Sequence, residues 1–160
     1  MRLLLLSDTH GDFSAAQRAV LSQPSAEVVL FMGDGCAEIE DLACLYPEKM
    51  FCAVRGNMDW NSDQPALRLE TFEGVRILML HGNGYGVGHG APALRSLAKE
   101  HGAQIVAYGH THTADVDYED GVYYLNPGSA RRPRDDTRPS YMTLDIRHNG
   151  ILPSVVRFDR

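Results

Sequence analysis

Asp, His and Asn residues gather in five short segments of the chain, and each segment also holds a glycine. The segments are 8–12, 33–35, 56–59, 81–82 and 109–112. Carboxylate, imidazole and amide groups without a thiolate suit divalent metals such as manganese, iron, nickel, cobalt or zinc. The glycines let the backbone turn sharply and approach a ligand closely. The residue types therefore indicate a metal site.

Seven side chains in these segments are candidate ligands, a number that suits two ions better than one. They are Asp8, His10, Asp34, Asn57, His81, His110 and His112. Two ions about 3.5–4 Å apart can hold a bridging hydroxide and clamp the oxygens of an in-line phosphoryl displacement. Asp34 stands alone in its segment, so its carboxylate is the candidate bridge. Any one segment could equally be a cap, a turn or a solvated loop, but five together favour a metal centre.

Each segment follows a predicted β-strand. Apolar runs predict strands at 2–7, 27–32, 50–54, 75–80 and 104–108, and helical patterns predict helices at 12–22, 37–46 and 92–101. Ligands bind at the carboxyl edge of open α/β sheets, so these five strand ends can bring the seven side chains into one cluster. We expect a mixed sheet or two stacked sheets, with the helices outside.

Three hairpins complete the predicted architecture. Strands 67–72 and 75–80 flank Glu73-Gly74, strands 115–118 and 122–125 flank Asp120-Gly121, and strands 141–146 and 151–158 flank Asn149-Gly150. Such dipeptides favour tight two-residue turns. In helix 37–46 we expect Ile39, Leu42 and Leu45 to face inward. Because no Pro-, Ser- or Gly-rich linker divides the chain, residues 1–160 are predicted to form one domain.

The composition, 44% hydrophobic and 22% charged, is that of an ordinary globular protein. A formal net charge of −6 argues against nucleic acid as a partner. The apolar run 3–6 is too short for a signal peptide or a membrane span, so we expect a cytoplasmic protein. Cys36, Cys44 and Cys52 are expected to be buried small hydrophobes. Capping or solvated positions are expected for His89, His101 and His148.

In their order along the chain, these segments resemble the calcineurin-like metallophosphoesterase superfamily. The matching motifs are Asp-x-His at 8–10, Gly-Asp at 33–34, Gly-Asn at 56–57, His-Gly at 81–82, Gly-His-Thr-His at 109–112 and Asn-Pro-Gly-Ser at 126–129. The short chain resembles the small bacterial and archaeal phosphodiesterases, a branch that includes the retromer scaffold subunit. The resemblance implies a four-layer α/β/β/α sandwich of the metallo-dependent phosphatase type.

The resemblance also implies a role for each candidate ligand. It assigns Asp8, His10 and His112 to a first metal ion, assigns Asn57, His81 and His110 to a second, and makes Asp34 the bridge. Manganese is the expected metal, with nickel, iron, cobalt or zinc as alternatives. Direct catalytic roles are expected for Asp34, Asn57 and His81. Supporting contacts behind the ligands are expected from Asp12, Thr111 and Asn126.

The chain departs from the wider family pattern at two positions. Many members have Gly-Asn-His-Glu, where the histidine protonates the leaving group, but this chain has Met58 and Asp59. Met58 carries no proton to donate, which favours the phosphodiesterase branch and argues against efficient monoester hydrolysis. Asn83 stands where close relatives often have a histidine, which indicates a different substrate contact. For Arg131, Arg132, Arg134 and Arg138 we favour a solvated loop over a grip on a second phosphate.

The leading hypothesis is a phosphodiesterase that hydrolyses a small phosphodiester by attack of a metal-bridging hydroxide. The alternative is a non-catalytic scaffold or binding module of the same fold, against which the seven intact ligands argue. A nuclease is disfavoured because the sequence has no basic groove. The oligomeric state stays open, and a homo-oligomer is compatible with the sequence.

Overall fold

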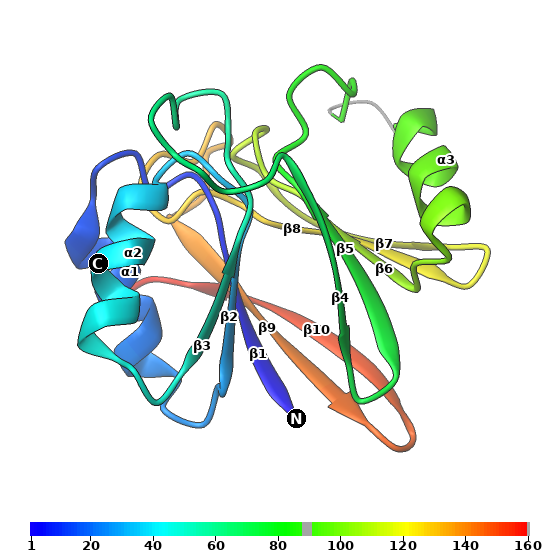
Figure 1. Cartoon of the computed structure of the whole chain (residues 1–160), viewed down its shortest axis with the longest axis horizontal. Coiled ribbons are helices and arrows are strands. Elements are labelled where there is room, and N and C mark those ends of the chain that lie inside the picture. Colours follow the sequence, from blue (N-terminus) through cyan, green and yellow to red (C-terminus); the bar gives the residue numbers. More distant parts are fainter. Residues whose placement is uncertain (88–90, 160) are drawn as a thin grey trace.

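Two five-stranded β-sheets form the centre of the computed structural model, which describes residues 1–87 and 91–159 (Figure 1). The first sheet has the order β10 (Gly150–Arg157), β9 (Ser140–Arg147), β1 (Arg2–Leu6), β2 (Val28–Phe31) and β3 (Met50–Ala53). β1, β2 and β3 run parallel, while β9 is antiparallel to both of its neighbours. The three parallel strands therefore end at one edge of this sheet.

The second sheet also has parallel strands at its centre. Its order is β4 (Leu67–Phe72), β5 (Val75–Leu80), β6 (Ile105–Ala107), β8 (Val122–Pro127) and β7 (Ala114–Glu119). β4 and β7 are antiparallel to their neighbours. Both central residues of the turns Glu73-Gly74 and Asp120-Gly121 have positive φ, as the predicted tight turns require. The third turn is shifted by one residue, because Gly150 pairs with Arg147 inside the ladder.

The helices cover the outer faces of the sheets. α1 (Phe13–Ser22) and α2 (Cys36–Leu45) pack on the first sheet, and α3 (Pro92–His101) packs on the second (Figure 1). Between the sheets lies an apolar cluster drawn from both of them. The chain thus forms the four-layer α/β/β/α sandwich that the resemblance implied. Among the described residues, no helix is long and apolar enough to cross a membrane.

Two expectations about α2 are wrong. Leu45 is 58% exposed, although Ile39 and Leu42 are buried as expected. Each step of three residues falls about 60° short of a full helical turn, so Leu45 has rotated about 120° away from Ile39. Cys44 is also exposed, whereas Cys36 and Cys52 are buried.

His101 and His148, two of the histidines expected to have ordinary roles, are not part of either group of candidate metal ligands. The carbonyl of His101, at the end of α3, accepts a hydrogen bond from the Arg76 guanidinium at 2.6 Å. His148 is exposed in the turn between β9 and β10. His89 lies outside the described residues.

Candidate metal centre

Loops from both sheets meet where the parallel strands end, at the top of the view in Figure 1. The Asp8 N–H donates to the Gly33 carbonyl at 3.0 Å, which joins the loops after β1 and β2. The His110 N–H donates to Asp8 Oδ2 at 3.1 Å, which joins the second sheet to the first. The Met58 N–H donates to Asp34 Oδ1 at 2.8 Å. These hydrogen bonds hold together loops that are far apart in the sequence, and the loops meet in one place.

Ligand atoms converge on two neighbouring positions. At the first, His112 Nε2 lies 3.2 Å and His10 Nε2 lies 3.7 Å from Asp8 Oδ1. At the second, His81 Nε2 lies 3.3 Å from Asp34 Oδ2 and 4.0 Å from Asp8 Oδ1. In each group, three ligand atoms lie within 4.8 Å of one another, close enough to hold one ion. Five of the seven predicted ligands are thus brought together directly.

The other two predicted ligands border the same site. The ring of His110 lies 5.1 Å from the ring of His81, measured between centroids. Asn57 is exposed and lines a hollow of about 480 Å³ together with His110 and Asp34. The resemblance assigned Asp34 alone to a bridging position, but in this geometry Asp8 is the residue that belongs to both groups. Asp34 belongs to the second group, and its Oδ2 lies 3.9 Å from His10 Nε2 of the first.

Unpartnered buried atoms show that these residues fit a metal ion. Among the described residues, three buried side-chain atoms have no hydrogen-bond partner, and two of them, Asp8 Oδ1 and His81 Nε2, lie in this site. His81 Nδ1 lies 2.6 Å from the Met32 carbonyl, which fixes the ring so that the Nε2 lone pair faces the site. His112 Nδ1 lies 2.7 Å from the Arg132 carbonyl and is fixed in the same way. Lone pairs aimed at one point suit a cation between them.

The charges of the site lead to the same conclusion. Burial alone would raise the pKa of Asp8, but the nearby imidazoles of His10 and His112 outweigh it and hold that pKa below its usual range. Burial alone would lower the pKa of His81, yet the nearby carboxylate of Asp34 prevails and raises it. An ionised carboxylate is therefore kept in a buried place, where it requires positive charge nearby.

The backbone around the ligands adopts a rare conformation. Five ligands have φ values in the left-handed region: Asp8 at 56°, His10 at 45°, Asp34 at 61°, His110 at 68° and His112 at 60°. Non-glycine residues seldom adopt this conformation, and strain of this kind concentrates at functional sites. Gly56 and Gly109 allow the close approach of these loops. A Cβ on Gly56 would lie 2.1 Å from Asp34 Oδ1, and one on Gly109 would lie 1.9 Å from Ser7 Oγ.

Asp59 holds two ligand-bearing loops together, a role that the sequence analysis missed. Its carboxylate accepts hydrogen bonds from four backbone N–H groups at 2.7–2.9 Å, those of Asp34, Gly35, Cys36 and Gly56. Burial raises the pKa of Asp59, but these donors outweigh burial and lower it. An acidic residue that closes a short glycine-containing turn is a common acceptor for backbone N–H groups, and this signal was available in the sequence.

Glu38 supports the first ligand loop and was also missed. Its Oε1 accepts hydrogen bonds from Thr9 Oγ1 at 2.8 Å and from the Gly11 N–H at 2.7 Å. Glu38 lies in the first turn of α2, so this helix carries the loop that contains His10. No local pattern marks this contact, because Thr9 and Glu38 are 29 residues apart.

The supporting residues implied by the resemblance have different roles. The buried Asn126 side chain donates to the Gly109 carbonyl at 3.0 Å and to Thr111 Oγ1 at 2.9 Å, which braces the loop after β6. Asp12 acts at a helix terminus instead. Its carboxylate accepts from the Ala15 N–H at 2.9 Å and caps α1.

The arginine segment is exposed as expected, but it lies against the ligands. The Arg131 guanidinium donates to the His10 carbonyl, and Arg134 Nη1 donates to the His110 carbonyl at 3.5 Å. Arg132 lines the hollow next to His10. Positive charge is therefore present beside the carboxylates, where an anionic ligand would meet it.

A two-sheet sandwich with candidate Asp and His ligands clustered where its parallel strands end is the arrangement expected of a metal-dependent phosphoesterase. Residues 1–149 match the calcineurin-like phosphoesterase superfamily domain, and the chain belongs to that family. It is 31% identical to the probable metallophosphoesterase YsnB of Bacillus subtilis, over 99% of this chain and 90% of that protein.

Two further similarities extend over the whole fold. The chain is 27% identical to the phosphodiesterase YfcE of Escherichia coli, over 100% of this chain and 94% of that protein. The crystal structure of a predicted phosphoesterase from Streptococcus pneumoniae superposes with a TM-score of 0.84 at 24% identity, covering 98% of this chain and 88% of that one. The similarity to this structure confirms the fold.

Proposed function

We propose that this chain is a two-metal phosphodiesterase that acts, as one domain, on a small phosphodiester in the cytoplasm. The observation that carries the proposal is the convergence of seven ligand-type residues, with Asp8 Oδ1 and His81 Nε2 buried and unpartnered. A relative that is named a phosphodiesterase supports the choice of diesters. Manganese is the first candidate metal, and nickel, iron, cobalt and zinc are the alternatives.

Two bound divalent ions would polarise the phosphoryl group and lower the pKa of a water molecule, so that it can attack at neutral pH. Among the chain's own residues, Asp34 holds the central position, because its Oδ2 lies 3.3 Å from His81 Nε2 and 3.9 Å from His10 Nε2. Asn57 and His81 border the same place and complete the proposed catalytic set. The guanidinium groups of Arg132 and Arg134 face the hollow that an anionic substrate would enter.

Met58 sets a limit on the reaction. Its side chain is 55% exposed at the border of the hollow, where the resemblance expects the acid that protonates the leaving group. A thioether has no proton to give. The neighbouring Asp59 is held ionised by backbone donors, so it does not replace that acid. Diesters with good leaving groups are therefore the preferred substrates.

The decisive experiment is an activity screen of purified protein loaded in turn with each candidate metal. Diesters, cyclic nucleotides and monoesters are compared, and elemental analysis measures the metal content of the same samples. The expected result is near two equivalents of manganese per chain, with hydrolysis of aryl diesters. Absence of hydrolysis in protein with confirmed metal would favour the scaffold alternative. A stoichiometry well below one in folded protein would contradict the two-metal centre.

A further inference from the structure

An exposed tryptophan borders the metal centre. Trp60 is 83% exposed, the largest exposure among the big hydrophobic side chains described. It is also the only tryptophan of the chain. Trp60 lines a hollow of about 530 Å³ that it shares with Met58, Asp34 and His10. An indole ring left in water beside proposed metal ligands needs an explanation, because tryptophan is usually largely buried.

The backbone beneath Trp60 is held in place before any ligand binds. The neighbouring Asp59 accepts four backbone hydrogen bonds at 2.7–2.9 Å and ties its turn to the loop after β2. The Met58 N–H is bonded to Asp34 Oδ1 at 2.8 Å. Met58 and Trp60 therefore flank an anchored residue, and a ligand that contacts them does not have to order the turn first.

The surroundings of the metal centre are asymmetric in charge. Arg132 lines both hollows, but on the Trp60 side Glu38 and Glu40 also line the hollow and repel a second phosphate. On the other side, the hollow next to Asn57 is lined by Arg132 and Arg134. A phosphodiester has two ester arms, and each hollow suits an arm of a different chemical kind. The Trp60 side suits an uncharged, flat group, and the arginine side suits an anionic one.

We propose that Trp60 and Met58 form a subsite that binds an aromatic or heteroaromatic ester arm of the substrate by stacking on the indole ring. This inference rests on the proposed phosphodiesterase function and narrows its substrate class to diesters in which one arm carries a flat aromatic ring, such as a nucleoside or an aryl group. Every such ring has a π-face, so stacking tolerates different rings. The thioether of Met58 adds a polarizable contact at the ring edge.

Phenylphosphonate and methylphosphonate test the subsite without any turnover, because their P–C bonds are not ester bonds. Calorimetry on manganese-loaded protein measures the affinity of each. Wild type is expected to bind phenylphosphonate at least about fivefold more tightly than methylphosphonate. Trp60→Ala should bring that ratio close to one, and Trp60→Phe should keep most of it. Tyr118→Ala, which removes an aromatic side chain 60% exposed on β7, is the matched control and should keep the wild-type ratio.

The single tryptophan provides an independent signal. Phenylphosphonate at saturation should change Trp60 emission, and methylphosphonate at equal occupancy should change it much less. Equal affinities in wild type, or an unchanged ratio in Trp60→Ala, would overturn the subsite even if the protein hydrolyses diesters. A phenylphosphonate preference that Trp60→Ala abolishes, in protein that hydrolyses no diester, would instead retain the subsite and refute the proposed function.

Discussion

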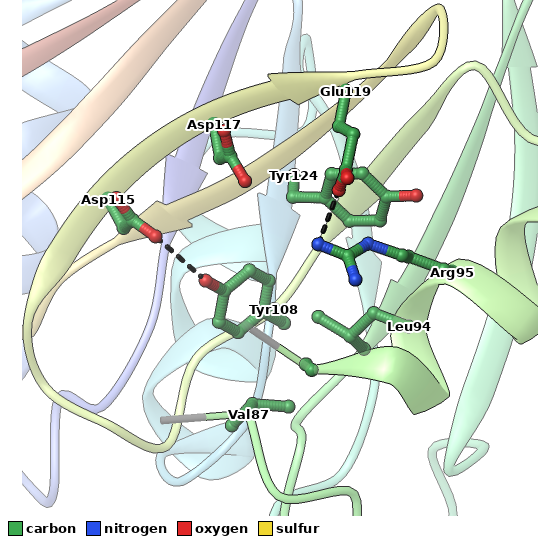
Figure 2. Close-up of a pocket in the computed structure, with 9 residues that line it drawn as sticks. Val87, Leu94, Arg95, Tyr108, Asp115, Asp117, Glu119 and Tyr124 are labelled. Carbon is green, nitrogen blue, oxygen red and sulfur yellow. Dashed lines mark hydrogen bonds and ion pairs between the residues drawn. The ribbon is translucent and has the colours of Figure 1, made fainter. Parts of the chain in front are cut away.

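Two hollows of this protein contain several carboxylates, and they differ in what those carboxylates contact. The pocket in Figure 2, of about 80 Å³, lies between α3 and β7 on the outer face of the second sheet. Its carboxylates have protein partners. Tyr108 Oη donates to Asp115 Oδ2 at 3.3 Å, and Arg95 Nη2 lies 2.5 Å from Glu119 Oε2 (Figure 2). Acidic residues are engaged there in ordinary pairs.

The metal centre has the opposite arrangement. Asp8 Oδ1 and His81 Nε2 are buried and have no hydrogen-bond partner among the described residues. Glu119 Oε2 of the outer pocket also lacks a hydrogen bond, but it forms an ion pair with Arg95, 2.5 Å away. The acidic side chains of the outer pocket come from alternate positions of one regular strand, β7. The ligands come instead from five loops, most of them at left-handed φ. Residue type alone therefore does not distinguish a metal site, whereas unpartnered atoms that converge on a strained backbone do.

The largest effect should come from Asp34→Asn. Asn offers one neutral oxygen in place of two charged ones, so it cannot join both ligand groups with the same charge. We expect turnover to fall by more than the roughly 10–100-fold typical of residues behind the ligands, with loss of bound manganese. Turnover, metal content and circular dichroism are measured on the same sample. The fold should survive, because Asp34 lies at a strand end outside the apolar clusters.

Asp117→Asn makes the same chemical change in the outer pocket and serves as the control. It should keep wild-type turnover and metal content, because Asp117 lies on β7 and its carboxylate accepts a hydrogen bond from the Tyr118 N–H of the same strand. Near-normal turnover and metal content in Asp34→Asn would show that Asp34 is not the bridge. A loss in Asp117→Asn as large as in Asp34→Asn would remove the distinction between the two hollows.

The second effect concerns Asp59, which positions ligands through backbone contacts. In Asp59→Asn, an NH₂ group replaces one oxygen and faces two N–H donors, so two hydrogen bonds are lost. We expect manganese affinity to fall by about 10–100-fold, as for other residues behind metal ligands. Calorimetric titration with manganese measures it, and Asp63→Asn, at an exposed position of the same loop, is the matched control. Unchanged affinity in Asp59→Asn would mean that these bonds do not hold the site.

Much of the fold could be predicted because its signals are local. Pro92 begins α3 and Gly102, at φ 59°, ends it, so the predicted and observed bounds agree. The seven ligand candidates were found because their residue types follow the ends of apolar strands. For Asp59 the local contact with Gly56 was readable in the sequence, but its other three partners lie 23–25 residues away and only the folded chain brings them close. The partners of Glu38 lie 27 and 29 residues away, so nothing local marked it. Leu45 was wrongly expected to be buried, because a three-residue spacing falls short of a full helical turn and places this side chain on another face of α2.

A smaller effect is expected from Met58→His, which tests the missing acid at the metal centre. Wild-type rates on a series of phosphodiesters should fall steeply as the leaving-group pKa rises, because no residue protonates the departing oxygen. A well-placed acid raises the rate about 10²–10⁴-fold. The imidazole introduced by Met58→His should raise the rate on alkyl esters by at least about tenfold. The slope should therefore flatten in Met58→His. A slope already flat in wild type would mean that another group donates the proton.

The smallest effect should come from Tyr108→Phe, at the boundary between the two hollows. Tyr108 immediately precedes the loop that carries His110, but its side chain points into the outer pocket and bonds Asp115 (Figure 2). Its ring is buried, and burial together with the nearby Asp115 raises the pKa of Tyr108, so the hydroxyl stays a neutral donor at any physiological pH.

Removing one such hydrogen bond costs about 0.5–1.5 kcal/mol, which for a chain of this size lowers Tm by a few degrees. Thermal unfolding measures that shift, and the same sample should keep turnover within about twofold of wild type, because Asn126 and Asp8 brace the loop from the other side. A loss of turnover above tenfold at a small Tm shift would show that the outer pocket sets the position of His110, and the two hollows would then act as one unit.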